Sequence, residues 1–380
     1  MKITLVTHSM YPDSIGGREK YVYYLADALG KRGHEVKVFT CIPTLHSKVK
    51  KYDNFTVYYF PSFDIPLKGA KYRLPLAMLP YLLADKADVI HAQDLHHFTT
   101  LVSAFVAKIK NKPLVVTEHG YSSMEGLMKV LIRTYEKTFV KFIGRSSSQV
   151  IGVSDFISNE LKERYKISPE KIVTVHNAVE ENNFSDTNNQ FKEKYSLQNK
   201  RVILGVGRLT KEKGFQYLIM AFKKISEEFP DTILVIIGPK SSYKKILDRL
   251  VKRLELAEKI LFTGPLEDEM VKSAIKSCEM VVIPSKYEPF PFVALEALSY
   301  EKPAIASSVG GLPEIFTHNV NGLLVKPEDA QDLEEKIKIL LTDKNVKANI
   351  IRNSKESLQR FTWKSFIEKM ESIYEKASAH

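Results

Sequence analysis

Two glutamates eight residues apart, Glu288 and Glu296, are the arrangement in this chain that best indicates chemistry. Glu288 lies in a loop bounded by prolines, and Glu296 lies inside the helix that we expect to begin near Phe292. The loop follows an apolar strand, 280–283, and such junctions face the ligand crevice of a parallel α/β sheet. The free amides at the helix start attract an anion, and the carboxylates offer acceptor oxygens to hydroxyl groups. An anion flanked by hydroxyls describes a nucleotide diphosphate-sugar.

A second group of residues, upstream, strengthens this interpretation, because each glutamate alone is also typical of a helix cap or a solvated surface. An apolar strand, 202–206, runs into Gly207, Arg208, Lys213 and Gly214, and a helix follows. The guanidinium of Arg208 offers a planar fork to phosphate oxygens, and Lys213 adds a compact charge. This order of residues is more specific than that of a surface loop with ordinary basic residues.

Departure of a diphosphate from a sugar builds up negative charge, which a cation must offset. The one acidic cluster that could hold a metal, 267–269, follows Gly264 and Pro265 at an apparent helix start. Acidic residues at that position compensate the helix dipole. Because Arg208 and Lys213 supply positive charge themselves, we expect no metal and no cofactor.

Together these segments resemble the family 4 retaining glycosyltransferases, which have the GT-B fold. The resemblance spans nearly the whole chain and is carried by segments 3–7, 16–17, 117–120, 205–214, 288–297, 306–315 and 321–325. It implies metal-independent transfer of a hexosyl or N-acetylhexosaminyl group from a nucleotide diphosphate-sugar, with UDP favoured over GDP. It also implies retention of configuration, in which the leaving phosphate takes the acceptor proton and no dedicated base is needed.

The resemblance implies roles for individual residues as well. Catalytic roles fall to His119 near the donor sugar, to Glu288, which holds that sugar, and to Arg208 and Lys213. Glu296 is implied to bind the ribose hydroxyls. The other implied donor contacts are Gly16 and Gly17 over the diphosphate, Gly207, the nucleobase loop Gly264, Pro265 and Leu266, and Phe290, Phe292 and Val293 beside the sugar and phosphate. Glycines in a turn and a lone histidine after a strand are also typical of purely structural roles. The chain departs from the family pattern at Pro291, where glycine is usual, so one backbone donor is missing.

Length and patterning predict two domains. A chain of 380 residues exceeds most single cores. Strand-like and helix-like segments alternate throughout, which favours doubly wound parallel sheets. We expect an α/β protein of the GT-B type, with two Rossmann-like domains facing across a cleft. The N-terminal, acceptor-side domain is expected at 1–178 and the nucleotide-sugar domain at 179–361. The last helix, about 362–380, is implied by the resemblance to return to the first domain.

Charge and composition indicate anionic partners. The net charge is +11, and the two cysteines lie at or near apolar strands, which favours the cytosol over a disulfide-forming compartment. No apolar run is long enough for a membrane span, and no zinc spacing or aromatic RNA-binding motif favours nucleic acid.

Segment 127–145 repeats a basic residue every fourth position between apolar ones. This pattern predicts a helix lying on the inner face of an anionic membrane, or alternatively a solvated basic face over an ordinary core helix. We expect the acceptor to be a glycan, a lipid-linked molecule or a small molecule. Asp94 and His96 are candidate acceptor contacts, since they follow strand 89–92 at the expected crevice. Arg18 is a further candidate because it adjoins Gly16 and Gly17, whose loop is implied by the resemblance to close over the diphosphate and the acceptor.

Three other functions fit parts of the pattern. The same scaffold serves nucleotide-sugar epimerases, which would act on the donor without any acceptor. A non-catalytic nucleotide-sugar-binding partner is a second alternative, against which the intact charged residues argue. An NAD-dependent oxidoreductase ranks last, because the first loop has Gly16 and Gly17 but no G-x-G-x-x-G motif.

Overall fold

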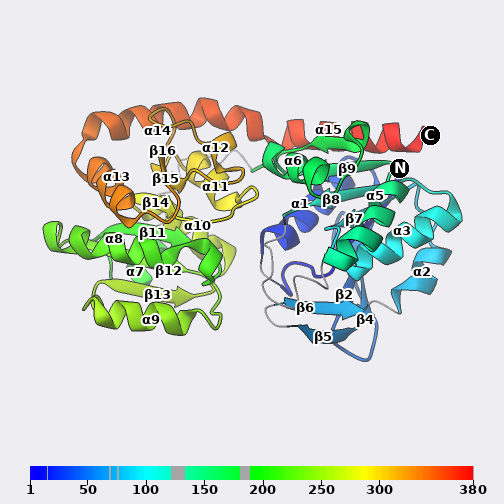
Figure 1. Cartoon of the computed structure of the whole chain (residues 1–380), viewed down its shortest axis with the longest axis horizontal. Helices are drawn as coiled ribbons and strands as arrows, with labels where there is room; N and C mark the ends of the chain where they lie inside the picture. The colour runs from blue at the N-terminus through cyan, green and yellow to red at the C-terminus, as the bar shows by residue number, and fades with distance from the viewer. Residues whose placement is uncertain (15, 68–69, 75–76, 121–132, 180–188, 380) are drawn as a thin grey trace. The chain divides into compact units, whose positions relative to one another are not determined.

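The computed structural model of the chain describes all residues except 15, 68–69, 75–76, 121–132, 180–188 and 380. Its contacts divide the chain into two compact units. The first comprises Met1–Asn177 together with Lys364–His380, and the second comprises Ala178–Trp363. Each unit is an α/β domain with a parallel sheet at its centre (Figure 1), as the alternating sequence pattern predicts.

The N-terminal unit is built on an eight-stranded sheet in the order β10-β9-β8-β7-β1-β2-β4-β3. Its strands are parallel except β3, which pairs antiparallel with β4. The strands are β1 (Lys2–Val6), β2 (Glu35–Ile42), β3 (Lys48–Lys51), β4 (Thr56–Pro61), β7 (Val89–Gln93), β8 (Leu114–Glu118), β9 (Gln149–Gly152) and β10 (Ile172–Thr174). A separate hairpin consists of β5 (Phe63–Leu67) and β6 (Ala70–Leu74). Central strands such as β7 and β8 are buried along their whole length, as parallel strands covered on both faces are.

Helices cover this sheet, and the last one comes from the C-terminus of the chain. The helices are α1 (Gly17–Lys31), α2 (Met78–Ala84), α3 (Phe98–Lys110), α5 (Lys141–Ser146), α6 (Asp155–Glu163) and α15 (Trp363–Ser378). A π-helical turn, Glu136–Val140, leads directly into α5. The hydroxyl of Tyr374 in α15 is hydrogen-bonded to Nδ1 of His91 in β7 at 2.8 Å. Glu371 of the same helix forms an ion pair with Arg32 of the N-terminal unit at 2.8 Å. The return of the last helix to the N-terminal domain is therefore confirmed.

The C-terminal unit has a six-stranded, all-parallel sheet in the order β13-β12-β11-β14-β15-β16. Its strands are β11 (Arg201–Val206), β12 (Thr232–Ile237), β13 (Ile260–Gly264), β14 (Met280–Ile283), β15 (Ala304–Ser307) and β16 (Leu323–Val325). Its helices are α7 (Gln190–Lys194), α8 (Phe215–Glu228), α9 (Lys244–Arg253), α10 (Asp268–Ser277), α11 (Phe292–Ser299), α12 (Leu312–Ile315), α13 (Ala330–Thr342) and α14 (Lys344–Leu358). One continuous apolar core joins α8, α9 and α13 to the sheet, with Phe215, Phe222 and Ile337 fully buried or nearly so.

Each sheet reverses its strand order beside its first strand, and this reversal positions the functional loops. In the C-terminal unit the order is that of a Rossmann sheet, and it reverses between β11 and β14. In the N-terminal unit the reversal lies between β1 and β7. Ligands of doubly wound sheets bind at the carboxyl ends of the strands beside such a reversal. The loops after these four strands carry the charged residues singled out from the sequence.

Several elements differ from the sequence expectations. We did not predict β3, β5, β6, β10 and β16, which are short, edge-located or polar. β3 reads Lys-Val-Lys-Lys, and lysines are typical of an exposed edge strand but carry little strand signal. Helix α11 begins at Phe292 and α10 at Asp268, both as predicted. Among the described residues, no helix has the length and apolar character needed to cross a bilayer.

Candidate functional site

The loops after β11 and β14 meet at the strand reversal of the C-terminal unit. Lys213 Nζ donates a hydrogen bond to Glu288 Oε2 at 2.5 Å, and Ser285 Oγ donates to the same oxygen at 2.9 Å. Glu288 is only 5% exposed, whereas the lysine is partly open to solvent. A carboxylate this buried is stable only with such partners. Two residues that are 75 positions apart in the chain thus form one charged pair at the expected ligand crevice.

Glycine holds these two loops against each other. Gly214 has φ of +68°, and a Cβ there would lie 1.8 Å from the carbonyl oxygen of Pro284. Gly310 has φ of +57°, and a Cβ there would lie 2.0 Å from the carbonyl oxygen of Glu288. Only glycine combines this backbone conformation with so close an approach. The backbone of the Glu288 loop is therefore fixed on two sides.

Most of the other predicted donor contacts belong to the same unit, whereas Gly16 and Gly17 belong to the N-terminal unit. Arg208 is exposed, two residues beyond the end of β11, and Gly207 has φ of +157° with the Lys213 side chain beside it. Glu296 lies in the second turn of α11. Phe292 and Val293 are the first two residues of that helix, so their backbone N–H groups have no acceptor within it. Gly264 ends β13 with φ of +79°, followed by exposed Pro265 and half-buried Leu266. Phe290 is buried against Phe361, so its side chain is a core residue and only its backbone is available to a ligand.

In the N-terminal unit, Asp94 ties together three loops at the carboxyl end of the sheet. Its Oδ1 accepts a hydrogen bond from the backbone N–H of His119 at 3.0 Å, and its Oδ2 accepts from Arg18 Nη1 at 2.5 Å. Asp94 is buried and has φ of +62°, a conformation that is costly for a residue with a side chain. Burial raises its pKa, but the Arg18 guanidinium and His97 outweigh this effect and hold the pKa well below its usual range. Asp94 is therefore ionised, and it holds Arg18 and the His119 backbone together.

Arg18 is held inside the unit by its neighbours. Besides Asp94, its guanidinium donates to Glu19 Oε1 at 2.8 Å and to Ser9 Oγ at 3.2 Å. His97 Nε2 lies 2.6 Å from Arg18 Nη1 and stacks on His8 with ring centroids 4.5 Å apart. Gly16 precedes α1, and a Cβ there would meet Glu19 Oε2 at 2.3 Å, while Gly17 opens the helix. The lack of a side chain at Gly16 thus leaves room for the Glu19 carboxylate that pairs with Arg18.

His96, another expected acceptor contact, is buried and lies against Glu136. Its Nε2 lies 3.2 Å from Glu136 Oε1, and its ring packs on Tyr165 at 5.4 Å. Glu136 also pairs with Arg164 at 2.7 Å. His96 thus connects the loop after β7 to the π-helical turn through Glu136.

Sequence reasoning gave no role to Glu118, although it stands in the 117–120 segment. Its two carboxyl oxygens accept hydrogen bonds from the backbone N–H groups of Leu95 and Gly120, at 2.9 and 3.0 Å. Burial and the neighbouring Asp94 carboxylate raise the pKa of Glu118 to about 8, against the lowering effect of the two backbone bonds. This side chain joins the loop after β7 to the loop after β8. The only sequence signal was its place directly before His119.

His119 is a neutral imidazole near pH 7. Its Nε2 lies 2.9 Å from Gln93 Oε1, and its ring meets Tyr21 edge-on with centroids 4.7 Å apart. Burial lowers its pKa to about 4, and the lowering effects of Arg18 and His97 act against the raising effect of Asp94. With the proton on Nε2 directed at Gln93, Nδ1 is left as an acceptor.

This lowered pKa predicts a pH dependence of stability. A histidine whose folded pKa lies below its unfolded value of 6.5 favours the folded state above pH 6.5, and that contribution is lost as pH falls through about 4. We expect the free energy of unfolding of wild type to fall between pH 6.5 and pH 4, and His119→Gln to reduce this fall. Urea unfolding at several pH values measures it. The matched control is His46→Gln, on an exposed loop, which should leave the slope as it is in wild type.

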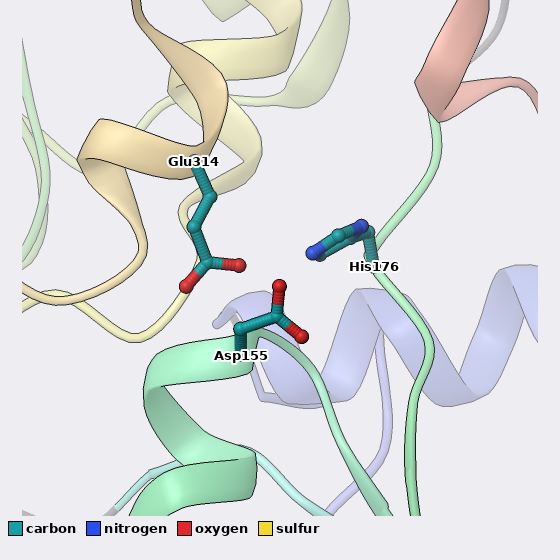
Figure 2. Close-up of side chains that lie close together, drawn as sticks. All are labelled: Asp155, His176 and Glu314. Carbon is teal, nitrogen blue, oxygen red and sulfur yellow. The ribbon is translucent and has the colours of Figure 1, made fainter.

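A carboxylate–imidazole pair is also present in the N-terminal unit. Asp155 begins α6 and accepts a hydrogen bond from Thr174 Oγ1 at 2.7 Å, and its carboxylate lies within 4.8 Å of the His176 ring (Figure 2). Figure 2 also draws Glu314, which belongs to α12 of the other unit. Within the N-terminal unit these are two ligands, fewer than the three or four of a usual zinc site.

The comparisons with known proteins agree with this architecture. The model of the glycosyl transferases group 1 matches residues 186–357, and the model of glycosyltransferase family 4 matches residues 15–183. An uncharacterized glycosyltransferase of Methanocaldococcus jannaschii is 31% identical over 98% of each chain. An N-acetyl-alpha-D-glucosaminyl L-malate synthase of Bacillus anthracis is 25% identical over 96% of this chain and 94% of its own.

The solved structures show the fold. HepE of Anabaena, in complex with UDP-glucose, superposes with a TM-score of 0.80 at 22% identity, covering 100% of both chains. The fold is GT-B, and the protein is a glycosyltransferase that transfers a sugar from a nucleotide-sugar. The chain belongs to glycosyltransferase family 4.

Proposed function

We propose that the protein transfers a hexosyl or N-acetylhexosaminyl group from a UDP-sugar, with retention of configuration and without a metal ion. The observation that carries this proposal is the Lys213–Glu288 pair at the β11/β14 reversal, beside exposed Arg208 and the start of α11. A cation, a carboxylate and free amides gathered at one strand reversal suit a diphosphate flanked by sugar hydroxyls.

In the proposed reaction the cations act on the leaving group. The bond between the anomeric carbon and the diphosphate oxygen breaks, and Arg208 and Lys213 offset the charge that gathers on that oxygen. The acceptor hydroxyl bonds to the same face of the anomeric carbon and gives its proton to the departing phosphate. Glu288 holds the hydroxyls of the donor sugar, and Glu296 holds those of the ribose.

His119 fits a supporting part in this scheme, because a neutral ring with Nδ1 as an acceptor binds a sugar hydroxyl without adding charge. His119→Ala then lowers turnover while leaving donor binding to the C-terminal unit intact. The acceptor contacts come from the loop around Asp94, whose own carboxylate is taken up by Arg18 and the His119 amide. The acceptor itself is a glycan, a lipid-linked molecule or a small molecule.

The preference for UDP is supported by similar proteins. HepE of Anabaena is solved with UDP, with UDP and glucose, and with UDP-glucose. The name of the Bacillus anthracis relative specifies an N-acetyl-glucosaminyl group, and a relative in Corynebacterium aurimucosum, 26% identical, is named D-inositol 3-phosphate glycosyltransferase. These names favour a hexosyl or N-acetylhexosaminyl donor.

A thermal-shift panel of UDP-, GDP-, ADP- and dTDP-sugars tests the donor. A ligand at 100 times its Kd stabilises the folded state by about 2.7 kcal/mol, which raises the melting temperature of its domain measurably. We expect UDP-glucose or UDP-N-acetylglucosamine to give the largest shift, and Glu296→Ala to reduce it. A larger shift with GDP-sugars, or no shift with any nucleotide-sugar, would refute the UDP assignment.

A further inference from the structure

An apolar cavity of about 490 Å³ opens on the N-terminal unit, away from the loops described above. It lies among α2, α3 and the π-helical turn that leads into α5, elements that lie close together in Figure 1. Its lining is almost wholly hydrocarbon, with Leu79, Leu101, Phe105, Phe139 and Phe142 as the large members. The volume is in the range of cavities that hold a small ligand or a chain of one.

Large apolar side chains are exposed at this cavity and next to it. Phe105 and Phe139, which line the cavity, are 52% and 44% exposed, and Ile109, four residues after Phe105 on α3, is 58% exposed. The inner side of the π-helical turn and of α5 is packed in the core, since Val140 of the turn and Ile143 of α5 are fully buried. The exposed apolar residues are therefore not needed to fill the core. Burying them against a partner surface would be favourable, because it removes apolar area from water.

A basic cavity of about 1020 Å³ adjoins the apolar one and shares Thr138 and Phe142 with it. Five cationic side chains line this cavity: Lys108, Lys112, Lys137, Lys141 and Arg145. The one carboxylate in its lining is Asp88, which already accepts a hydrogen bond from the Lys2 amide at 2.7 Å. Within the described part of the chain, none of the five cations forms an ion pair.

The sequence places apolar and basic groups on one side of the same helix. Phe105, Lys108 and Ile109 of α3 follow the three- and four-residue spacing of a helix face, and Lys112 continues it just beyond the helix end. Lys108 Nζ lies 5.6 Å from the ring centre of Phe142, which joins the two cavities at their boundary. We call the surface formed by Phe105, Ile109, Phe139, Lys108, Lys137 and Lys141 the lipid face.

We propose that the lipid face binds an anionic phospholipid bilayer, with one lipid chain in the apolar cavity and lipid phosphates in the basic cavity. Five cations that form no ion pair with the described residues, beside a hydrocarbon cavity, complement an anionic headgroup attached to a hydrocarbon chain. Other anionic partners would use the cations but leave the exposed phenylalanines in water. This membrane surface would be the partner of the proposed transferase. Vesicle binding itself does not require the transferase activity.

Vesicle co-sedimentation tests the proposal with the whole chain and no nucleotide-sugar. We expect binding to vesicles of phosphatidylcholine mixed with phosphatidylglycerol, weak binding to phosphatidylcholine alone, and a decrease with salt. Lys137→Gln/Lys141→Gln should weaken partition by about 25-fold, since each cation near an anionic surface contributes about fivefold. Phe139→Ser should weaken it by about tenfold and remove the binding that persists at high salt.

Matched variants elsewhere on the surface serve as controls. Lys252→Gln/Lys355→Gln removes the same charge from exposed positions of the other unit, and Leu45→Ser removes an 81% exposed apolar side chain. Both should bind vesicles as wild type does, and all variants should melt at the wild-type temperature.

Three results would overturn the proposal. The first is equal vesicle binding by wild type and the lysine variant. The second is an effect of the lysines with none of Phe139, which leaves only a generic basic surface. The third is self-association in solution that Phe139→Ser abolishes, which would assign the face to a second copy of the chain. The thermal-shift panel contains no lipid, and the vesicle assay contains no nucleotide-sugar. A negative result in one assay therefore does not affect the conclusion from the other.

Discussion

Lys213→Ala is expected to lower kcat/KM for the nucleotide-sugar by about 10²–10³, the scale measured when one preorganised charge-stabilising group is removed from an active site. Lys213 is the cation held at the strand reversal, 2.5 Å from Glu288. Its loss removes charge compensation for the departing diphosphate and also leaves the buried Glu288 carboxylate with Ser285 as its remaining hydrogen-bond donor among the described residues. Steady-state kinetics of UDP release measures the effect.

Two further variants separate these contributions. Lys211→Ala removes an exposed cation two residues away and should change kcat/KM by less than about twofold. Glu288→Gln keeps the size of the side chain and tests whether the carboxylate itself is needed for the sugar. If Lys213→Ala turned over as fast as the Lys211 control, the lysine would be a structural partner of Glu288 and nothing more.

Asp94→Ala is expected to destabilise the N-terminal unit by about 3 kcal/mol, because removing one member of a buried ion pair leaves the Arg18 guanidinium with Glu19 as its charged partner and the His119 amide without its acceptor. The carboxylate serves Arg18 at 2.5 Å and the His119 amide at 3.0 Å, so turnover should fall as well. Asp94→Asn should be milder in stability, since asparagine tolerates the left-handed conformation and keeps one acceptor oxygen. Urea unfolding and kinetics on both variants measure the two effects.

The control for backbone conformation is Lys166→Ala, at an exposed position of the same unit with φ of +54°. We expect it to cost less than about 1 kcal/mol, since no buried partner is lost. An Asp94→Ala protein as stable as this control would show that the Arg18 network does not depend on Asp94.

The sequence was sufficient for the elements that follow strong local patterns. The buried strands 202–206 and 280–283 and the helix start at Phe292 could be predicted, because apolar runs and prolines mark them locally. The neighbourhood of Lys213 and Glu288 followed from parallel topology, since both loops follow the carboxyl ends of strands that were expected to face the ligand crevice. What the sequence did not provide was their direct hydrogen bond, which depends on the close backbone approach at Gly214.

The contacts among the polar residues of the N-terminal unit could not be predicted from the sequence. Asp94 and Arg18 were expected to contact the acceptor, but they are bound to each other across 76 positions of the chain, a pairing that no local pattern encodes. Glu118 and His96 show the same limit, since the role of each depends on which backbone amide or carboxylate folds against it. Of segment 127–145, residues 127–132 lie outside the described part. Among its remaining residues Ile143 lies in the core and Phe139 is exposed, and the membrane alternative stays a prediction.

The central claim is that side-chain cations, not a divalent ion, offset the charge of the leaving diphosphate. The most direct test is the rate of UDP release from the preferred UDP-sugar by wild-type protein dialysed against EDTA, compared with the same protein given magnesium or manganese. The account predicts equal rates in the two conditions, with Lys213→Ala slow in both. Activity that vanishes in EDTA and returns with the metal would contradict it.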